Sequence, residues 1–362
     1  MLVAPGADAI TAVQKKKNAA KHVALLRRKA FPAVKPKATS FRPPAKVEPA
    51  DGDYTEGEDQ EVRRAAVAAL GTRNGTVVVT DANTGRVLTI VNQKMAFKSG
   101  FTPCSTIKIP VALAALTESL VERETPIRLS RQTRITMGMT EAIATSNNDY
   151  FARLGEKLGF ERVSYYAKLY GLGEKATLDV DAEQPGTIVA TPPKYGGIGI
   201  MTSYGLGFSL TPLEYAAVMG TVANGGTLYY LQYPRTPKEA ESLVPRVKRT
   251  LDLESQIESV RPGMMGAVEY GTAKQAGFDP NEPVYAKTGT CTDATTYQHL
   301  GWFGSFAQKG ERKLVVVVLL AGSKTFNGPV ASSVGGQVYK ALESQGYFSK
   351  AQPISPVAMI GH

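Results

Sequence analysis

The sequence has few of the residues on which most hydrolytic and metal sites depend. Its 362 residues include only 3 histidines: His22, His299 and His362. A histidine-based triad or a histidine-rich metal site within the folded part could draw only on His299. The patterns G-x-S-x-G and G-x-x-x-x-G-K-[ST] do not occur. Their absence excludes the usual nucleophile elbow of serine hydrolases and the P-loop of nucleotide-binding proteins.

Long hydrophobic runs are also missing. No stretch approaches the roughly 18 apolar residues that a membrane-spanning helix needs. The longest candidate, LVVVVLLAG at 314–322, is short and rich in valine, which predicts a buried strand. No export signal is evident, because LVAPGADAI at 2–10 has neither a basic start nor a proper apolar core. A hydrophobic content of 43% is nevertheless enough for a substantial core.

Positive charge is concentrated at one end of the sequence. The formal net charge is +10, and residues 1–50 carry eight lysines and three arginines against two acidic residues, which accounts for nine of these ten charges. Residues 1–60 are predicted to form a basic, Pro- and Lys-rich, largely disordered linker with one helix near 9–30. It would be a solvated linker or an electrostatic tether to an anionic wall polymer or membrane lipid. Without interleaved aromatic residues, it does not predict specific nucleic-acid binding.

Residues 61–362 are predicted to form one domain, with strands at both ends and helices between. Strands are expected as a pair joined by a DANTG turn within 74–93, and at 283–291, 299–308 and 313–322, followed by a last helix at 334–348. The helical insertion covers about 117–250, and 117–175 is predicted to be helical. In TPLEYAAVMGTVANGG, Thr211 is the expected helix cap, with Pro212 at the first position and Glu214 completing a capping box.

The stretch TPCSTIKIPVALAAL at 102–116 carries the first candidate chemistry. From Ser105 it predicts an apolar helix on which Lys108 shares a face with Ser105. A serine is a poor nucleophile until a base takes its proton, and a lysine whose pKa is lowered by burial can do so. The positive end of the helix dipole would favour negative charge developing at Ser105. Pro110 fits imperfectly, since it removes the hydrogen bond to the carbonyl of Thr106. Alternatively, the serine caps the helix and the lysine extends to solvent.

Two further short patterns accompany this stretch. SNN at 146–148 follows an apolar helical stretch and by itself predicts a turn or a helix cap. KTGT at 287–290 lies inside a strand pattern, where a glycine often marks the close approach of a ligand or another backbone. Each pattern is commonplace alone. Their order and their positions on a helix start, in a helical region and on a strand make the combination specific.

With these three patterns the sequence resembles the penicillin-binding transpeptidases and serine β-lactamases, which carry S-x-x-K, S-x-N or S-D-N, and K-T-G motifs. The resemblance runs from about Arg73 to the C-terminal helix and includes GLGFSLTPLEYAAVMGTVANGG at 205–226 and GWFGSFA at 301–307. It implies an α/β (α+β) fold, with an antiparallel sheet flanked by helices and an inserted all-helical subdomain. It implies neither a cofactor nor a metal.

The resemblance assigns a role to each motif residue. Ser105 would be the nucleophile that forms an acyl-enzyme, and Lys108 would be its base. Ser146 would relay a proton towards the leaving group, and Asn148 would hydrogen-bond to the substrate and to Lys108. Lys287 would supply positive potential for a substrate carboxylate.

The K-T-G strand would contribute the remaining substrate contacts. The resemblance implies hydroxyl contacts from Thr288 and Thr290, while Gly289 would keep the strand bare so that substrate can lie against it. The backbone N–H groups of Ser105 and Thr290 would form the oxyanion hole.

The two cysteines flank two of the motifs. Cys104 precedes Ser105 and Cys291 follows KTGT, an arrangement that resembles some carbapenem-hydrolysing β-lactamases. If helix and strand meet, the resemblance implies a Cys104–Cys291 disulfide, for which the Cα atoms must lie roughly 4.4–6.8 Å apart. The alternative is two buried free thiols. A disulfide would imply an extracytoplasmic site, in the periplasm or cell envelope.

Three functions within the resemblance remain open. A D,D-transpeptidase or D,D-carboxypeptidase would act on the D-Ala-D-Ala end of peptidoglycan stem peptides and be acylated by β-lactams. A serine β-lactamase would need a deacylating water, yet E-x-x-L-N is absent, and Asn148 stands where the group with a carbamylated lysine has an apolar residue. A β-lactam sensor module would not turn over. Glu183 and Asp293 lie near the motifs without an assigned role.

Overall fold

The computed structural model describes residues 49–98, 100–130, 132, 134–178 and 180–350. The predicted linker up to residue 48 and the predicted helix near 9–30 lie outside these residues. No helix within the described ranges is both long and apolar enough to cross a membrane.

A five-stranded antiparallel sheet forms the centre, in the order β2-β1-β11-β10-β9. The strands are β1 (Gly75–Asp81), β2 (Val87–Val91), β9 (Val284–Thr292), β10 (His299–Lys309) and β11 (Arg312–Gly322). All were predicted from sequence. The valine-rich β11 lies in the middle and is buried on both faces, which explains its continuous apolar run. Among the described residues, β9, which carries KTGT, is an edge strand that pairs with another strand on one side only.

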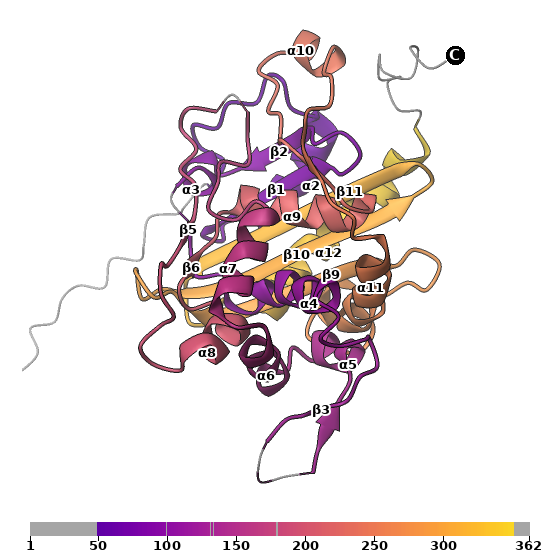
Figure 1. Cartoon of the computed structure of the whole chain (residues 1–362). Helices are drawn as coiled ribbons and strands as arrows, with labels where there is room; N and C mark the ends of the chain where they lie inside the picture. Colours follow the sequence, from indigo (N-terminus) through magenta and orange to yellow (C-terminus); the bar gives the residue numbers. More distant parts are fainter. Residues whose placement is uncertain (1–48, 99, 131, 133, 179, 351–362) are drawn as a thin grey trace, which may run out of the picture. The chain divides into compact units, whose positions relative to one another are not determined.

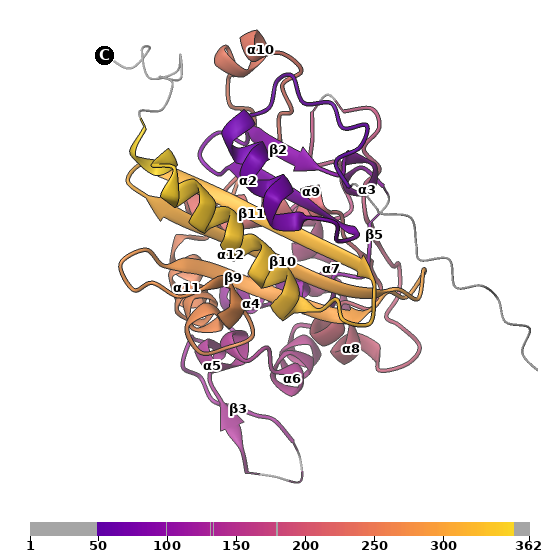
Figure 2. The same cartoon turned by 180° about the vertical axis from the view of Figure 1, so that it is seen from behind.

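Helices cover both faces of this sheet. Figure 2 shows α2 (Gln60–Leu70) and α12 (Gly328–Ser344) across one face, and Figure 1 shows α4 (Lys108–Thr117), α9 (Pro212–Asn224) and α11 (Glu254–Glu269) in front of the other. Successive strand residues point to opposite faces. Val316 and Val318 therefore pack with α2 and α12, whereas Val315 and Val317 belong to the second core with α4 and α9.

The region between β2 and β9 is mainly helical. Its other helices are α3 (Gln93–Ala96), η1 (Cys104–Ile107), α5 (Met139–Ala144), α6 (Asn148–Leu158), α7 (Phe160–Leu169), α8 (Gly197–Tyr204), α10 (Pro237–Glu241) and η2 (Lys274–Ala276); η3 (Tyr347–Ser349) follows α12. The cap of α9 is the predicted one: Thr211 and Glu214 form a capping box, with Pro212 at the start.

The expectation of an all-helical insertion is wrong in detail. Three two-stranded ladders interrupt it: β3 (Ile127–Arg128) with β4 (Thr136–Met137), β5 (Thr187–Ile188) with β6 (Phe208–Ser209), and β7 (Thr227–Tyr229) with β8 (Val247–Thr250). Within the predicted helical stretch 117–175, Ser119 has φ 53° just after the end of α4. Pro126 and the β-branched residues beyond it then favour extended backbone.

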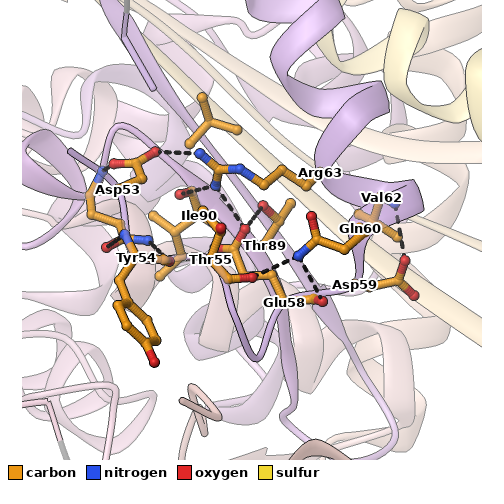
Figure 3. Close-up of polar contacts among 12 residues, drawn as sticks. Asp53, Tyr54, Thr55, Glu58, Asp59, Gln60, Val62, Arg63, Thr89 and Ile90 are labelled. Carbon is orange, nitrogen blue, oxygen red and sulfur yellow. Dashed lines mark hydrogen bonds and ion pairs between the residues drawn. The ribbon is translucent and has the colours of Figure 1, made fainter. Parts of the chain in front are cut away.

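Residues 49–59, assigned to the linker from sequence, are packed onto the domain. Figure 3 shows Arg63 of α2 paired with Asp53 (3.0 Å) and Glu58 (2.7 Å). Glu58 also accepts hydrogen bonds from Thr89 Oγ1 (2.7 Å) and Ile90 N (2.9 Å) on β2. These three charged residues, named here the ion-pair cluster, hold the segment against edge strand β2. The folded part thus begins before the predicted boundary at residue 60.

Candidate active site

The segment that carries Ser105 is a tight turn rather than the start of an α-helix. Cys104–Ile107 forms the 3₁₀ turn η1, and α4 begins at Lys108. Pro110 is then the third residue of α4. The amides of a first helical turn lack α-helical acceptors, so the proline costs less than the sequence suggested. Cys104 has φ 54°, an uncommon conformation for a non-glycine residue.

Two glycines let η1 approach its neighbours. A Cβ on Gly289 of β9 would lie 3.0 Å from Pro103 O and 3.1 Å from Cys104 Cβ. A Cβ on Gly205 would lie 2.5 Å from Pro103 Cγ. The glycine of KTGT therefore faces the turn that carries Ser105, and its expected role of keeping the strand bare for substrate stays a prediction. The expected Cys104–Cys291 disulfide is present in this same contact, with Cα atoms 5.5 Å apart.

Lys108 is the centre of the site. Its side chain is fully buried, and its Nζ lies 3.1 Å from Ser105 Oγ, 2.7 Å from Asn148 Oδ1 and 3.1 Å from Ser146 Oγ. It also donates to the carbonyl of Ser146 (2.7 Å). Burial, followed by the nearby charge of Lys287, lowers the pKa of Lys108 to about 6. At neutral pH the amine is therefore mainly uncharged and able to take the proton of Ser105.

Ser146 occupies the turn between α5 and α6. Its φ of 59° is a left-handed conformation, and the following Asn147 caps α6 by accepting from Tyr150 N (2.8 Å). The cap starts α6 at Asn148, which directs the Asn148 amide to Lys108. Sequence reasoning overlooked Phe151, whose ring lies 5.5 Å from Lys108 Nζ. The sequence could have indicated that Phe151 belongs to the site, because it lies three residues after Asn148 on the predicted helix.

Lys287 approaches the same serine from β9. Its Nζ donates to Ser146 Oγ (2.8 Å) and to the carbonyl of Thr288 (2.8 Å). The side chain is fully buried, and burial lowers the pKa of Lys287 to about 7. Two lysines thus converge on one hydroxyl; Lys108, Lys287 and Ser146 are named here the lysine cluster. In the part of the chain that the structure describes, neither lysine has a carboxylate partner.

The backbone N–H groups of Ser105 and Thr290 are both available. Asp293 N donates to Gln298 O across the hairpin (2.8 Å), and the register pairs Thr290 with Gly301. Hydrogen-bonded and non-hydrogen-bonded pairs alternate along an antiparallel ladder. Asp293 is a hydrogen-bonded position, so Thr290, three residues before it, is a non-hydrogen-bonded position. The N–H of Thr290 therefore points to the free edge of β9. The N–H of Ser105 lies in the first turn of η1, where amides have no partner within the helix.

The two threonines of KTGT differ in exposure. Thr290 is exposed, and its Oγ1 accepts from Gly328 N (2.7 Å), which leaves its own proton free to donate. Thr288 is only 3% exposed, and its hydroxyl is paired with that of Thr272 at 2.6 Å. The expected substrate contact from Thr288 is therefore not supported by its position, because its side chain is buried and its hydroxyl is already paired with Thr272.

Glu183 and Asp293 have structural partners. Asp293 accepts from Thr102 N (2.8 Å) and Thr296 N (2.7 Å), and so ties the β9–β10 hairpin to the residues before η1. Although burial opposes it, these hydrogen bonds lower the pKa of Asp293. Glu183 accepts from Ala176 N (2.8 Å) and Thr177 N (2.9 Å), which holds its own loop.

Residues 75–340 match the family described as the penicillin binding protein transpeptidase domain. The chain belongs to this family, as the three motifs led us to expect.

Known relatives and solved structures agree. Stage V sporulation protein D of Bacillus subtilis is 29% identical over 281 residues, covering 69% of this chain and 43% of that protein. Peptidoglycan D,D-transpeptidase PbpA of Mycobacterium tuberculosis is 27% identical over 218 residues, covering 57% and 44% respectively. The chain thus spans somewhat under half the length of these relatives.

The crystal structure of Pseudomonas aeruginosa PBP2 in complex with WCK 5153 has a TM-score of 0.69 at 22% identity, covering 82% of this chain and 78% of that one. This likeness shows the fold.

Proposed function

We propose that the protein is a penicillin-binding D,D-transpeptidase that acts on the D-Ala-D-Ala end of peptidoglycan stem peptides. The observation that carries this proposal is the buried, largely uncharged Lys108 amine 3.1 Å from Ser105 Oγ. Such an amine is a competent base for a serine nucleophile at neutral pH. The printed names of relatives, among them peptidoglycan D,D-transpeptidases, support the substrate class.

The proposed reaction has two acyl transfers. Lys108 takes the proton of Ser105 as Oγ attacks the carbonyl carbon of the penultimate D-Ala, and the N–H groups of Ser105 and Thr290 stabilise the oxyanion. Ser146, which hydrogen-bonds to both lysines, passes a proton to the leaving nitrogen, and the terminal D-Ala departs as its amine. The amine of a second stem peptide then attacks the acyl-enzyme, so a peptide bond forms and Ser105 recovers its proton.

Substrate binding would use the exposed edge of β9. The Thr290 hydroxyl can donate to the substrate carboxylate while it accepts from Gly328 N. Lys287 supplies positive potential to the degree that it is protonated, and Asn148 can donate its amide N–H groups while its Oδ1 accepts from Lys108. Gly289 contributes indirectly, by allowing η1 to reach the strand.

Two observations favour transfer over β-lactam hydrolysis. Among the described residues, the side chains that bond to Lys108 and Ser146 are serine, asparagine and lysine, so no carboxylate is in place there to activate a water. Lys108 Nζ already has four oxygen neighbours within 3.1 Å, and a carbamate on that nitrogen would have to displace some of them.

We also propose an extracytoplasmic location. Disulfides persist in oxidising compartments, and the Cys104–Cys291 bond lies within the domain. The basic residues 1–50 would add an electrostatic tether to the wall or membrane. Deleting residues 1–45 should weaken sedimentation with isolated envelopes at low salt; unchanged sedimentation would reject the tether alone.

A pulse-chase with a fluorescent penicillin tests the main proposal. We expect an adduct that depends on Ser105, is lost in Ser105→Ala, and persists for many minutes. A brief adduct with steady antibiotic consumption would make the protein a β-lactamase, and no adduct at all would overturn the proposal. Incubation with a pentapeptide stem and an acceptor amine, followed by mass spectrometry, separates transfer from simple hydrolysis by a carboxypeptidase.

A further inference from the structure

The loop between α11 and η2 touches two of the three motif segments at once. Its Gly271 packs so tightly on the end of α5 that a Cβ would lie 2.1 Å from the carbonyl oxygen of Ala144. The next residue, Thr272, donates its backbone N–H to that same carbonyl (3.1 Å). Ala144 is the last residue of α5 and lies two positions before Ser146. The loop therefore supports the turn that presents Ser146.

The side chain of Thr272 makes the second connection. Its Oγ1 lies 2.6 Å from Thr288 Oγ1, on the face of β9 opposite Lys287. Thr288 is nearly buried, and its carbonyl accepts a hydrogen bond from Lys287 Nζ (2.8 Å). A shift of Thr288 therefore changes both the backbone that presents Lys287 and one of the acceptors of its amine.

These two connections meet again at Ser146. Its hydroxyl lies 3.1 Å from Lys108 Nζ and 2.8 Å from Lys287 Nζ. The α5–α6 turn supplies the serine, and β9 supplies Lys287 from a point 141 residues further along the chain. Hydrogen bonds weaken steeply as distance and angle depart from the optimum. The relative position of turn and strand therefore decides whether Ser146 stays bonded to both lysines.

We propose that Thr272 is a positioning residue that holds the Ser146 turn and the KTGT strand at the separation that proton relay requires. The proposal rests on the proposed function. Thr272 contacts neither Ser105 nor the lysines; it acts through the Ala144 carbonyl and the Thr288 hydroxyl. Its loss should slow acylation while the fold is retained.

The loop offers a matched control. Tyr270 OH donates to Glu141 Oε2 of α5 (3.1 Å) at an exposed site, so it joins the loop to α5 without reaching β9. Tyr270→Phe removes that bond alone. Thr272→Val removes the hydroxyl but keeps the side-chain shape and the N–H bond to Ala144, and Thr272→Ser keeps a hydroxyl.

The experiment measures the second-order rate of Ser105 acylation by a fluorescent penicillin from pH 5 to 9, together with urea unfolding. We expect Thr272→Val to acylate about 5- to 15-fold more slowly, the effect of one lost hydrogen bond, with a displaced pH profile. Thr272→Ser should stay within about threefold of the original rate because it retains the hydroxyl, and Tyr270→Phe should match the original protein in rate and profile.

An unchanged acylation rate and pH profile in Thr272→Val would overturn the proposal, as would equal rate losses in Thr272→Ser and Thr272→Val. A rate loss in Tyr270→Phe as large as that in Thr272→Val would also overturn it. So would a rate loss in Thr272→Val that the unfolded fraction explains and that leaves the pH profile unchanged. If the original protein itself forms no Ser105 adduct, both the proposed function and the role of Thr272 are rejected. Labelling of the original protein with no effect of Thr272→Val rejects the role of Thr272 alone.

Discussion

The ion-pair cluster and the lysine cluster both bury ionisable side chains, but they differ in what surrounds each ionisable group. In the ion-pair cluster, Arg63 meets Asp53 at 3.0 Å and Glu58 at 2.7 Å. In the lysine cluster, two like charges meet neutral oxygens instead. In the ion-pair cluster, the two carboxylates counteract the effect of burial on the pKa of Arg63. In the lysine cluster, the charge of Lys287 adds to the effect of burial on the pKa of Lys108, since both disfavour the protonated amine.

The difference explains how one fold uses buried charge for two purposes. The ion pairs of Arg63 with Asp53 and Glu58 hold residues 49–59 to β2, which covers a sheet edge that would otherwise be open to pairing with other chains. Lysines without a carboxylate lose their protons more readily, and the pKa of Lys108 falls to about 6. The same burial that would destabilise an ion lowers the pKa of the amine that we propose as the base.

The largest expected effect is the loss of the base. Lys108→Met should reduce the rate of Ser105 acylation by about 10²–10⁴-fold, the range for general base catalysis. The free energy of unfolding should be unchanged or higher, because a buried amine is replaced by an apolar side chain of similar length. Urea unfolding and penicillin labelling measure the two quantities, with exposed Lys168→Met as control. Acylation at the original rate would exclude Lys108 as the base.

Removing the single cation of the ion-pair cluster should have the opposite pattern. Arg63→Met leaves Asp53 and Glu58 buried without a counter-charge and should lower the free energy of unfolding by about 3–5 kcal/mol. The neighbouring Arg64 is exposed, so Arg64→Met is the matched control and should have little effect. The acylation rate per folded molecule should not change. Equal stability of the two variants would remove the distinction drawn between the clusters.

The disulfide tests whether the lysine cluster depends on a covalent link. Cys104→Ala with Cys291→Ala should lower the free energy of unfolding by about 2–4 kcal/mol, since the bond closes a long loop of the unfolded chain. Acylation should also slow, because the turn carrying Ser105 is then held to β9 only by packing around Gly289. The oxidised and reduced forms of the original protein provide a comparison without substitution. Identical unfolding curves for the two forms would contradict this expectation.

The smallest expected effect is a shift in pH dependence. Acylation should rise with pH as Lys108 loses its proton at a pKa of about 6. Lys287→Met removes a nearby positive charge, so the pKa of Lys108 should rise and the rising limb should move to higher pH. The height of the plateau reports on substrate binding, whereas its midpoint reports on this coupling. A midpoint that moves to lower pH would be incompatible with like-charge repulsion.

The same pKa has a consequence for stability. Between about pH 6 and the ordinary value of 10.5, the unfolded chain holds a proton on Lys108 that the folded protein lacks, so the free energy of unfolding should rise with pH. The difference between the original protein and Lys108→Met isolates this contribution. A difference that does not change across this range would contradict it.

The sequence predicted elements whose determinants are local. Alternation and β-branched runs located the five sheet strands, and the Thr211–Glu214 box located the start of α9. It failed between Ser119 and Gly138, where a helical pattern was extended through Pro126 into the β3–β4 ladder. It also placed Asp53 and Glu58 in a linker, because nothing nearby in the sequence shows that their partners are Arg63 and β2.

The sequence by itself determined the three motifs, the antiparallel α/β architecture and the pairing of Cys104 with Cys291 once the family resemblance was seen. Only the tertiary structure decided that Ser105 lies on a 3₁₀ turn, that the Thr288 hydroxyl is paired with that of Thr272, and that Ser146 stands between two lysines. The physical reason is range. Helix caps, turns and strand alternation depend on neighbours a few residues away, whereas burial, pKa and the direction of a hydroxyl depend on groups that only folding brings together.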